Sequence, residues 1–195
     1  DYPRGHIYQG FGENPTLYAF LGINGHNGID IAMPEGTPIL ATAGVVCEAK
    51  NTPEGYGKHI RILTDPDADG SYHELTFGHL RDIFVPLGMR VKDSQIIGTM
   101  GNTGFVISGN TPFWGNAPAG RGVHLHFGIR ECSLNDTGWV TTYSTGQKAN
   151  VKNYNNGFKG QIDPMILLDE WLKDNLTKQV SILQKLVELK KIKIA

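Results

Sequence analysis

Residues 123–127 read Val123-His124-Leu125-His126-Phe127, a strict alternation of apolar and imidazole side chains. Alternation over a short run is typical of a half-buried β-strand, in which successive side chains point to opposite faces. His124 and His126 therefore project from the same face of the predicted strand. A lone histidine is usually a hydrogen-bonded core or surface residue, but two on one face of a buried strand suggest a shared function.

A second cluster of potential metal ligands lies far earlier in the chain. Residues 25–30 read Gly25-His26-Asn27-Gly28-Ile29-Asp30, which places an imidazole and a carboxylate four residues apart at a turn that enters a strand. Both donor types suit zinc. Burying several imidazoles and a carboxylate without a metal or a hydrogen-bond network is costly, so the two motifs together predict a shared ion. Three protein ligands would leave a fourth position open, as in catalytic zinc sites.

The chain up to residue 164 predicts a mainly β fold with minor α content. All 25 glycines and 10 prolines lie in this part, where they separate short runs of β-branched and aromatic residues. Residues 105–122 and 132–161 lack clear periodicity and are predicted to be long loop insertions. We expect antiparallel strands at Ile29–Ala32, Pro38–Cys47, His59–Leu63, Glu74–His79, Ile96–Met100 and Val123–Ile129.

Residues 165–195 differ in composition from the first domain, residues 1–164. Glycine and proline are absent, and apolar residues recur at three- and four-residue spacing, which predicts an amphipathic helix. The helix could dock on its own domain, form an oligomer contact or act as a spacer to a further region. The apolar positions are Met165, Leu168, Leu172, Leu176, Val180, Leu183 and Val187.

Composition argues against several classes of protein. The net charge of −1 provides no positive field for nucleic acid or anionic lipid. No apolar run reaches ~18 residues, so no membrane span is expected, and no secretion signal opens the chain. The first residue is Asp1 rather than methionine, as in a processed or excised piece. Cys47 and Cys132 are too few for a disulfide framework, and we expect them either to pair or to be buried thiols.

Further glycine-containing motifs follow in a fixed order along the chain. Together with the H-x-x-x-D and H-x-H patterns, they resemble the lysostaphin-like M23 family of zinc peptidases over about residues 4–131. The resemblance implies an antiparallel β-sheet peptidase core, a zinc cofactor, and hydrolysis of peptide cross-links in bacterial peptidoglycan. The motifs are Ile7–Gly12, Asp30–Ile39, Gly55–Gly57, Phe77–Leu80 and Gly98–Gly104.

Carried over residue by residue, the resemblance makes His26, Asp30 and His126 the zinc ligands. It makes His79 and His124 catalytic histidines outside the ligand set, with zinc-bound water as the nucleophile. His124 is the expected base, and His79 would stabilise the oxyanion or protonate the leaving amine, although the two roles could be reversed. No H-E-x-x-H helix is present, so histidine must replace the glutamate base of other metalloproteases.

Substrate contacts are predicted at four positions. Phe11, Tyr56 and Gly57 are expected to line the substrate groove, where glycine lets an extended peptide approach closely. Trp114 lies in residues 105–122, a loop longer than is usual in the family, and an exposed aromatic residue there suits a glycan or peptide contact. Ordinary packing is the alternative for Tyr56 and for Trp114.

The remaining histidines, His6, His59 and His73, are predicted to be structural. His73 lies six residues before His79, and this even spacing could place both side chains on one strand face.

Two alternatives to a free-standing wall peptidase remain open. One is a non-catalytic wall-binding or activator module, against which the presence of all five expected residues argues. The other is a peptidase module of a bacteriophage tail-tip protein, which the loop insertions and helical tail suit as well as they suit a bacterial autolysin. The expected location is outside the cell at the bacterial wall, or in the virion tail. The cleaved bond, in a glycine bridge or between D-alanine and diaminopimelate, cannot be read from the sequence.

Overall fold

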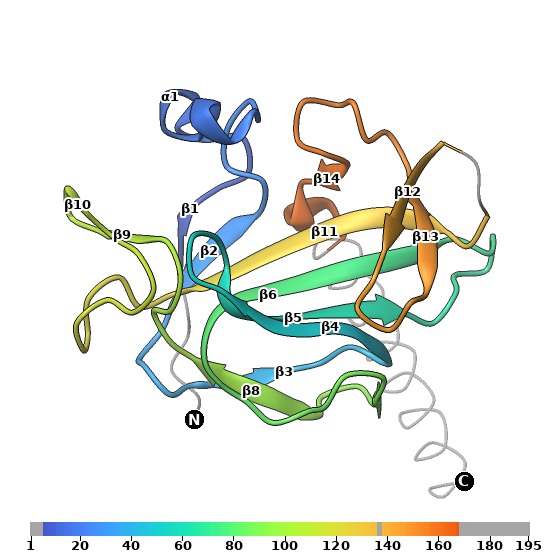
Figure 1. The fold of residues 1–195 in the computed structure, drawn as a ribbon, viewed down its shortest axis with the longest axis horizontal. Helices are drawn as coiled ribbons and strands as arrows, with labels where there is room; N and C mark the ends of the chain where they lie inside the picture. Colours follow the sequence, from blue (N-terminus) through green and yellow to red (C-terminus); the bar gives the residue numbers. More distant parts are fainter. Residues whose placement is uncertain (1–5, 136–137, 168–195) are drawn as a thin grey trace, which may run out of the picture. The chain divides into compact units, whose positions relative to one another are not determined.

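The computed structural model describes residues 6–135 and 138–167. Antiparallel β-structure dominates them, which confirms the predicted fold class (Figure 1). Twelve strands of this described part form one sheet, whose main path runs β1-β2-β11-β6-β5-β4-β7. In that order the strands are His6–Gln9, Ile29–Ala32, Leu125–Ser133, Tyr72–Ile83, Gly57–Thr64, Gly44–Thr52 and Arg90–Val91.

Shorter elements attach to this path. β8 pairs with β6 and with β3, whereas β13 and β14 pair with β11, and β12 pairs with β13. A separate hairpin joins β9 to β10, and the short helix α1 continues into the 3-10 helix η1. Their bounds are Pro38–Leu40 (β3), Ile96–Met100 (β8), Val106–Ser108 (β9), Thr111–Phe113 (β10), Trp139–Thr142 (β12), Lys148–Val151 (β13), Gln161–Ile162 (β14), Pro15–Tyr18 (α1) and Ala19–Leu21 (η1).

The prediction of one strand at Pro38–Cys47 was wrong, because the chain changes partner within it. β3 pairs with β8, whereas β4 pairs with β5 and β7. Between them, Ala41 N donates to the Gln95 carbonyl and Ala43 N donates to Asp93 Oδ1. These hydrogen bonds satisfy the backbone where the ladder is interrupted.

Residues 132–161 contain more regular structure than predicted. Cys132 and Ser133 extend β11, β12 and β13 lie within the segment, and β14 begins at its last residue, Gln161. A buried cluster stabilises this segment. Its members come from distant parts of the chain and form no regular apolar pattern, so sequence periodicity did not indicate the strands. Both cysteines are free and buried, so the thiol alternative holds and the disulfide does not form. The cluster consists of Cys47, Leu63, Cys132, Tyr143, Ala149 and Val151.

The chain divides into two compact units, Asp1–Asp163 and Pro164–Ala195. In the second unit residues 164–167 are helical, and the rest of the predicted amphipathic helix lies outside the described residues. Its role therefore stays a prediction. Across the described ranges, no helix has the length and apolar character needed to span a membrane.

Candidate active site

Three side chains with metal-ligand chemistry converge where β2 meets β11. Asp30 in β2 pairs directly with His126 in β11, and His26 lies in the turn before β2. His26 Nε2 is 2.9 Å from His126 Nδ1 and 3.1 Å from Asp30 Oδ1. His126 Nδ1 is 3.2 Å from the same carboxylate oxygen, and all three residues are buried. The structure thus brings together the whole predicted ligand trio.

The three donor atoms suit a tetrahedral cation. Zinc–ligand distances of about 2.0–2.2 Å imply roughly 3.3 Å between neighbouring ligand atoms. The observed separations of 2.9–3.2 Å are close to that value. The Nδ1 of His26 lies 3.2 Å from the Gly10 carbonyl, which can only accept, so the lone pair of His26 is on Nε2. Two imidazoles and a carboxylate directed at one point fit a bound zinc ion.

The carboxyl group of Asp30 is ionised at neutral pH. Burial alone would raise its pKa, but the adjacent imidazoles of His126, His26 and His124 hold that pKa well below its usual range. The hydroxyl of Tyr8 also donates to Oδ2 at 3.4 Å. Asp30 is therefore in the form that a metal ligand requires.

Packing orients the His126 ring. A Cβ at Gly28 would lie 2.5 Å from the Phe127 carbonyl oxygen and 2.8 Å from His126 Cε1, so only glycine fits there. The Tyr56 ring packs on His126, with centroids 4.9 Å apart, and its hydroxyl accepts a hydrogen bond from Asn27 at 2.8 Å. The Nε2 of His126 has no hydrogen-bond partner among the described residues. Tyr56 and Gly28 therefore set the direction of the ligand atom Nδ1.

His79 and His124 lie beside the trio, with their ring centroids 4.4 Å apart. The Nδ1 of His79 donates to the Thr103 carbonyl at 2.8 Å, and that of His124 donates to the Gly122 carbonyl at 2.9 Å. The Nε2 of His124 lies 3.7 Å from Asp30 Oδ2. Because Nδ1 carries the proton in both rings, each Nε2 remains free to accept one.

His79 reaches the site through an irregularity in β6. Gly78 lies opposite His126, so in a regular strand the next side chain would point to the other face. The φ angle of His79 is 61°, and β6 carries one extra residue against β5 at this point. The bulge turns His79 back toward the site. His73 does not follow it, because its Nδ1 pairs with Asp67 at 3.0 Å, away from the site.

Burial lowers the pKa of His79 well below its usual range, and the neighbouring His124 and His126 lower it further. The ring is therefore neutral at pH 7. Its Nε2 offers a lone pair in a desolvated site, which is the property of a proton acceptor.

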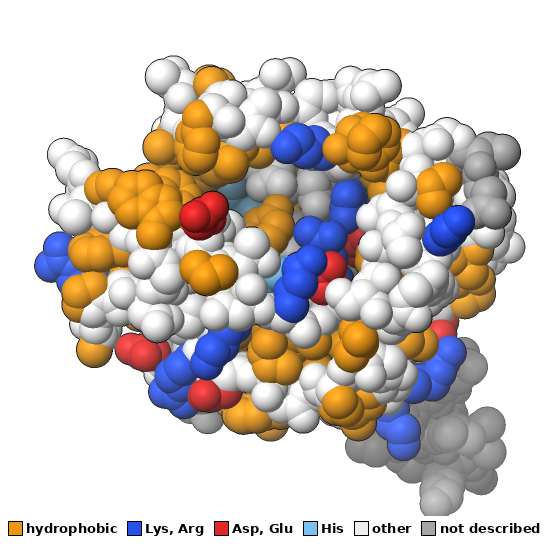
Figure 2. All heavy atoms as spheres, viewed as in Figure 1, with side chains coloured by type: hydrophobic (Ala, Val, Ile, Leu, Met, Phe, Trp, Pro, Cys, Tyr) orange, Lys and Arg blue, Asp and Glu red, His pale blue; other side chains and the backbone are white. Residues whose placement is uncertain are grey.

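The site opens into a cleft of about 1260 Å³, seen as the hollow in Figure 2. All five predicted metal and catalytic residues line it, and so does Tyr56. Phe11, Gly57 and Trp114 are not among its lining residues. Phe11 packs on Phe158 with centroids 4.5 Å apart. Trp114 is exposed, as expected, and packs on Phe105, which itself lines the cleft.

Gly57 supports the site from behind. Its φ angle is 59°, and a Cβ there would lie 2.3 Å from the Thr103 carbonyl oxygen. That carbonyl is the acceptor for His79 Nδ1. The glycine thus permits the close backbone approach that holds His79. His59 is hydrogen-bonded to Glu48 and to the Gly57 carbonyl and lies outside the catalytic cluster.

Several cleft residues were not predicted from the sequence. Tyr18 places its ring 5.3 Å from that of His26 and donates its hydroxyl to Gln9 Oε1 at 3.3 Å. Arg61 and Arg130 line the cleft from β5 and β11. The available signal for Arg130 was its spacing of four from His126 on one strand, which places both on one face.

Peptidase family M23 matches residues 24–138, more than half of the chain. The chain belongs to this family. Among curated M23 relatives, the glycyl-glycine endopeptidase ALE-1 of Staphylococcus capitis is 34% identical over 160 residues, which are 77% of this chain and 38% of that protein. The peptidoglycan DD-endopeptidase ShyA of Vibrio cholerae is 35% identical over 103 residues, 52% of this chain and 19% of its own length.

A solved structure agrees with this assignment. The catalytic domain of lysostaphin from Staphylococcus simulans has a TM-score of 0.54 and 27% identity, with 85% of this chain and 92% of that chain covered. As a member of M23, the chain is a metallopeptidase. It spans well under half the length of the curated relatives named above.

Proposed function

We propose that the protein is a zinc endopeptidase that hydrolyses peptide cross-links of bacterial peptidoglycan outside the cell. The observation that carries the proposal is the convergence of His26 Nε2, Asp30 Oδ1 and His126 Nδ1 within 2.9–3.2 Å of one another. Two imidazoles with a free Nε2 lie beside them. The substrate class is supported by relatives named as a glycyl-glycine endopeptidase and a peptidoglycan DD-endopeptidase.

His26, Asp30 and His126 would hold the metal. When bound, zinc supplies Lewis acidity, which polarises a peptide carbonyl and lowers the pKa of water to roughly 7. The neighbouring histidines would hold and move the proton, a role that typically contributes 10²–10⁴-fold. The rings of His79 and His124 both hold the proton on Nδ1 and present Nε2, so either can accept the proton while the other stabilises the oxyanion or protonates the leaving amine.

Zinc content and wall digestion test this proposal together. The purified chain should hold about one zinc per molecule and release soluble fragments from purified wall, and a chelator should abolish both until zinc is restored. Mass spectrometry of the fragments identifies the bond, in a glycine bridge or between D-alanine and diaminopimelate. Digestion that persists in the zinc-free protein contradicts the mechanism. Wall binding without zinc or digestion would support the non-catalytic module instead.

The context of the module stays a prediction. We propose a peptidase domain of residues 1–164 followed by a helix in residues 165–195. The bacteriophage tail-tip role is decided by the sequence upstream of Asp1. A second hydrolase module there favours the phage, and a secretion signal favours an autolysin.

A further inference from the structure

The floor of the cleft continues from the metal end to two arginines. His126 and Arg130 are four residues apart in β11, so they share one face of the sheet. Glu74 lies opposite Arg130 in β6, and Arg61 lies one strand further, in β5, opposite Thr76. Both arginines line the same cleft as the metal trio.

Glu74 is completely buried and holds Arg130 in place. Arg130 Nε and Nη2 donate to Glu74 Oε1 at 2.9 and 2.6 Å, and Nη2 also reaches Oε2 at 2.6 Å. Tyr143 donates its hydroxyl to Oε2 at 2.7 Å. Burial alone would raise the pKa of Glu74, but the charges of Arg130 and Arg61 lower it. Thr76 Oγ1 lies 3.5 Å from Oε1 as a weaker third donor, so the carboxylate is ionised and accepts its hydrogen bonds from Arg130, Tyr143 and Thr76.

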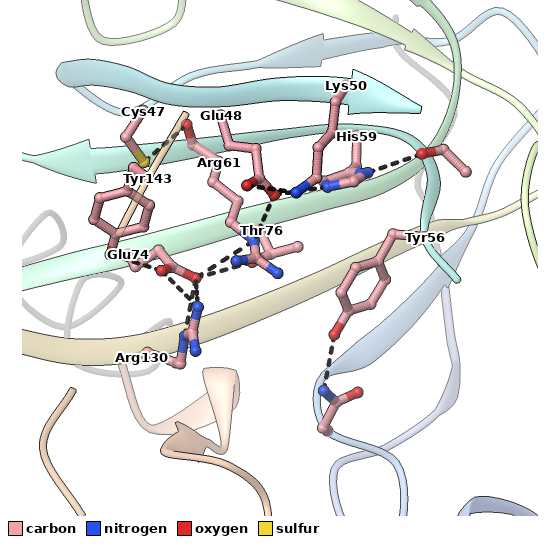
Figure 3. A network of polar contacts seen from close by, with 12 residues as sticks. Cys47, Glu48, Lys50, Tyr56, His59, Arg61, Glu74, Thr76, Arg130 and Tyr143 are labelled. Atoms are coloured by element: carbon pink, nitrogen blue, oxygen red, sulfur yellow. Dashed lines mark hydrogen bonds and ion pairs between the residues drawn. The ribbon is translucent and has the colours of Figure 1, made fainter. Parts of the chain in front are cut away.

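Arg61 lies between Glu48 and Glu74 and forms an ion pair with each (Figure 3), but neither contact is a hydrogen bond. Its Nε is 3.5 Å from Glu48 and 3.7 Å from Glu74, and this nitrogen has no hydrogen-bond partner in the described chain. Glu48 already accepts from His59 at 2.9 Å and from Lys50 at 2.8 Å. Both carboxylates accept their hydrogen bonds from other groups, so Arg61 interacts with them through charge alone. We take the guanidinium as a hydrogen-bond donor for a ligand in the cleft.

The cluster has an excess of positive charge. Three basic side chains face two acidic ones, so the net charge of the cluster is +1 when the neighbouring His59 is counted as neutral. Lys and Arg side chains border one side of the hollow in Figure 2. A guanidinium in a partly buried cleft binds a carboxylate through two parallel hydrogen bonds. The members are Lys50, Arg61, Arg130, Glu48 and Glu74.

We propose that Arg61, supported by Arg130, binds a free carboxylate of the peptide substrate. This inference rests on the proposed peptidase function. Arg61 is in register with Gly128 through Thr76, so it lies two residues (about 7 Å) along the sheet and two strands (about 10 Å) across it from His126, roughly 12 Å in all. An extended peptide covers that distance in about four residues. The site selects peptides that carry a carboxylate three to four residues from the cleaved bond, at the C-terminus or on a side chain, and a neutral glycine bridge would not use it.

Matched peptides test the site with the full chain and zinc. One cleavable cross-linked peptide is prepared with all carboxylates free, with only the C-terminal carboxylate amidated, and with only side-chain carboxylates amidated. We expect amidation of the recognised carboxylate to lower kcat/KM of the wild type roughly ten- to a hundredfold. Arg61→Gln should cause the same loss on the free peptide and make free and amidated peptides equal. Arg61→Lys keeps the charge without the fork and should retain part of the preference.

Arg90→Gln is the matched control. Arg90 is exposed in β7 and pairs with Asp65 at 2.6 Å, away from the cleft. The Arg90→Gln variant should therefore keep the wild-type ratio of kcat/KM between free and amidated peptides. Equal turnover of free and amidated peptides by the wild type overturns the carboxylate site while the peptidase stands. A preference that survives Arg61→Gln also overturns it. Failure of the wild type to cleave any of the peptides or purified wall overturns the proposed function, and the substrate site with it.

Discussion

The two ends of the cleft floor balance their charges in different ways. At the His126 end, two imidazole lone pairs and one carboxylate oxygen point at one another within 2.9–3.2 Å. At the Arg130 end, the buried carboxylate of Glu74 accepts hydrogen bonds from a guanidinium and a phenol. The first arrangement is the one for which we propose a cation from outside the chain, whereas in the second the buried carboxylate finds its counter-charge within the protein. The hydrogen-bond partners of each group in a buried polar cluster therefore indicate its role better than the residue types do.

Removing one ligand should have the largest effect. His126→Ala leaves two ligand atoms, so zinc content and wall digestion should be lost together, with activity falling by roughly 10⁶-fold or more. Metal analysis and fragment release measure the two effects. His73→Ala is the control, because His73 pairs with Asp67 outside the site and its loss should spare both. Zinc retained in His126→Ala would show that the ligand trio is misassigned.

His124→Ala separates binding from catalysis at the same end. His124 lies beside the trio but outside it, so the variant should keep its zinc while kcat falls by roughly 10²–10⁴-fold. The same two measurements on one preparation distinguish the outcomes. If zinc is lost as in His126→Ala, or if activity survives, the role assigned to His124 fails.

Glu74→Gln breaks the arginine end. It leaves Arg130 and Arg61 without a fully buried counter-charge, which should cost about 3–5 kcal/mol of unfolding free energy. Urea denaturation of the metal-free protein measures the loss. Glu131→Gln, which removes a partly exposed pair with Lys152, should cost less than about 1 kcal/mol. An equal loss of unfolding free energy in the two variants would mean that Glu74 contributes no more to stability than Glu131.

Protonation of Glu48 at low pH should lower the unfolding free energy by less than Glu74→Gln does. Burial would raise its pKa, but His59, Arg61 and Lys50 lower it from 4.5 to about 2. The ionised group stabilises the fold above pH 4.5, and up to about 3 kcal/mol is lost as the pH falls through 4.5 toward 2. Unfolding free energies at several pH values, compared with those of Glu48→Gln, isolate this contribution. Parallel pH curves for the two proteins would contradict it.

Local sequence patterns predicted the metal end better than the arginine end. His26 with Asp30, and His124 with His126, are close in sequence, so turn and strand periodicity already place their side chains together. Arg61 and Arg130 lie on different strands, and they meet only through the register of β5, β6 and β11. No pattern within a single strand predicts that register.

The amino-acid sequence by itself determined the class of fold, most strand positions and the residue types of a metal peptidase, because these depend on alternation and short spacing. Tertiary structure alone decided that His79 faces the metal trio, since a one-residue bulge reverses its side chain. It also decided the break after Leu40 and the juxtaposition of Arg61 with Glu74. In each case the outcome depends on which strands pair and in what register, and those choices are made by contacts between residues distant in the chain.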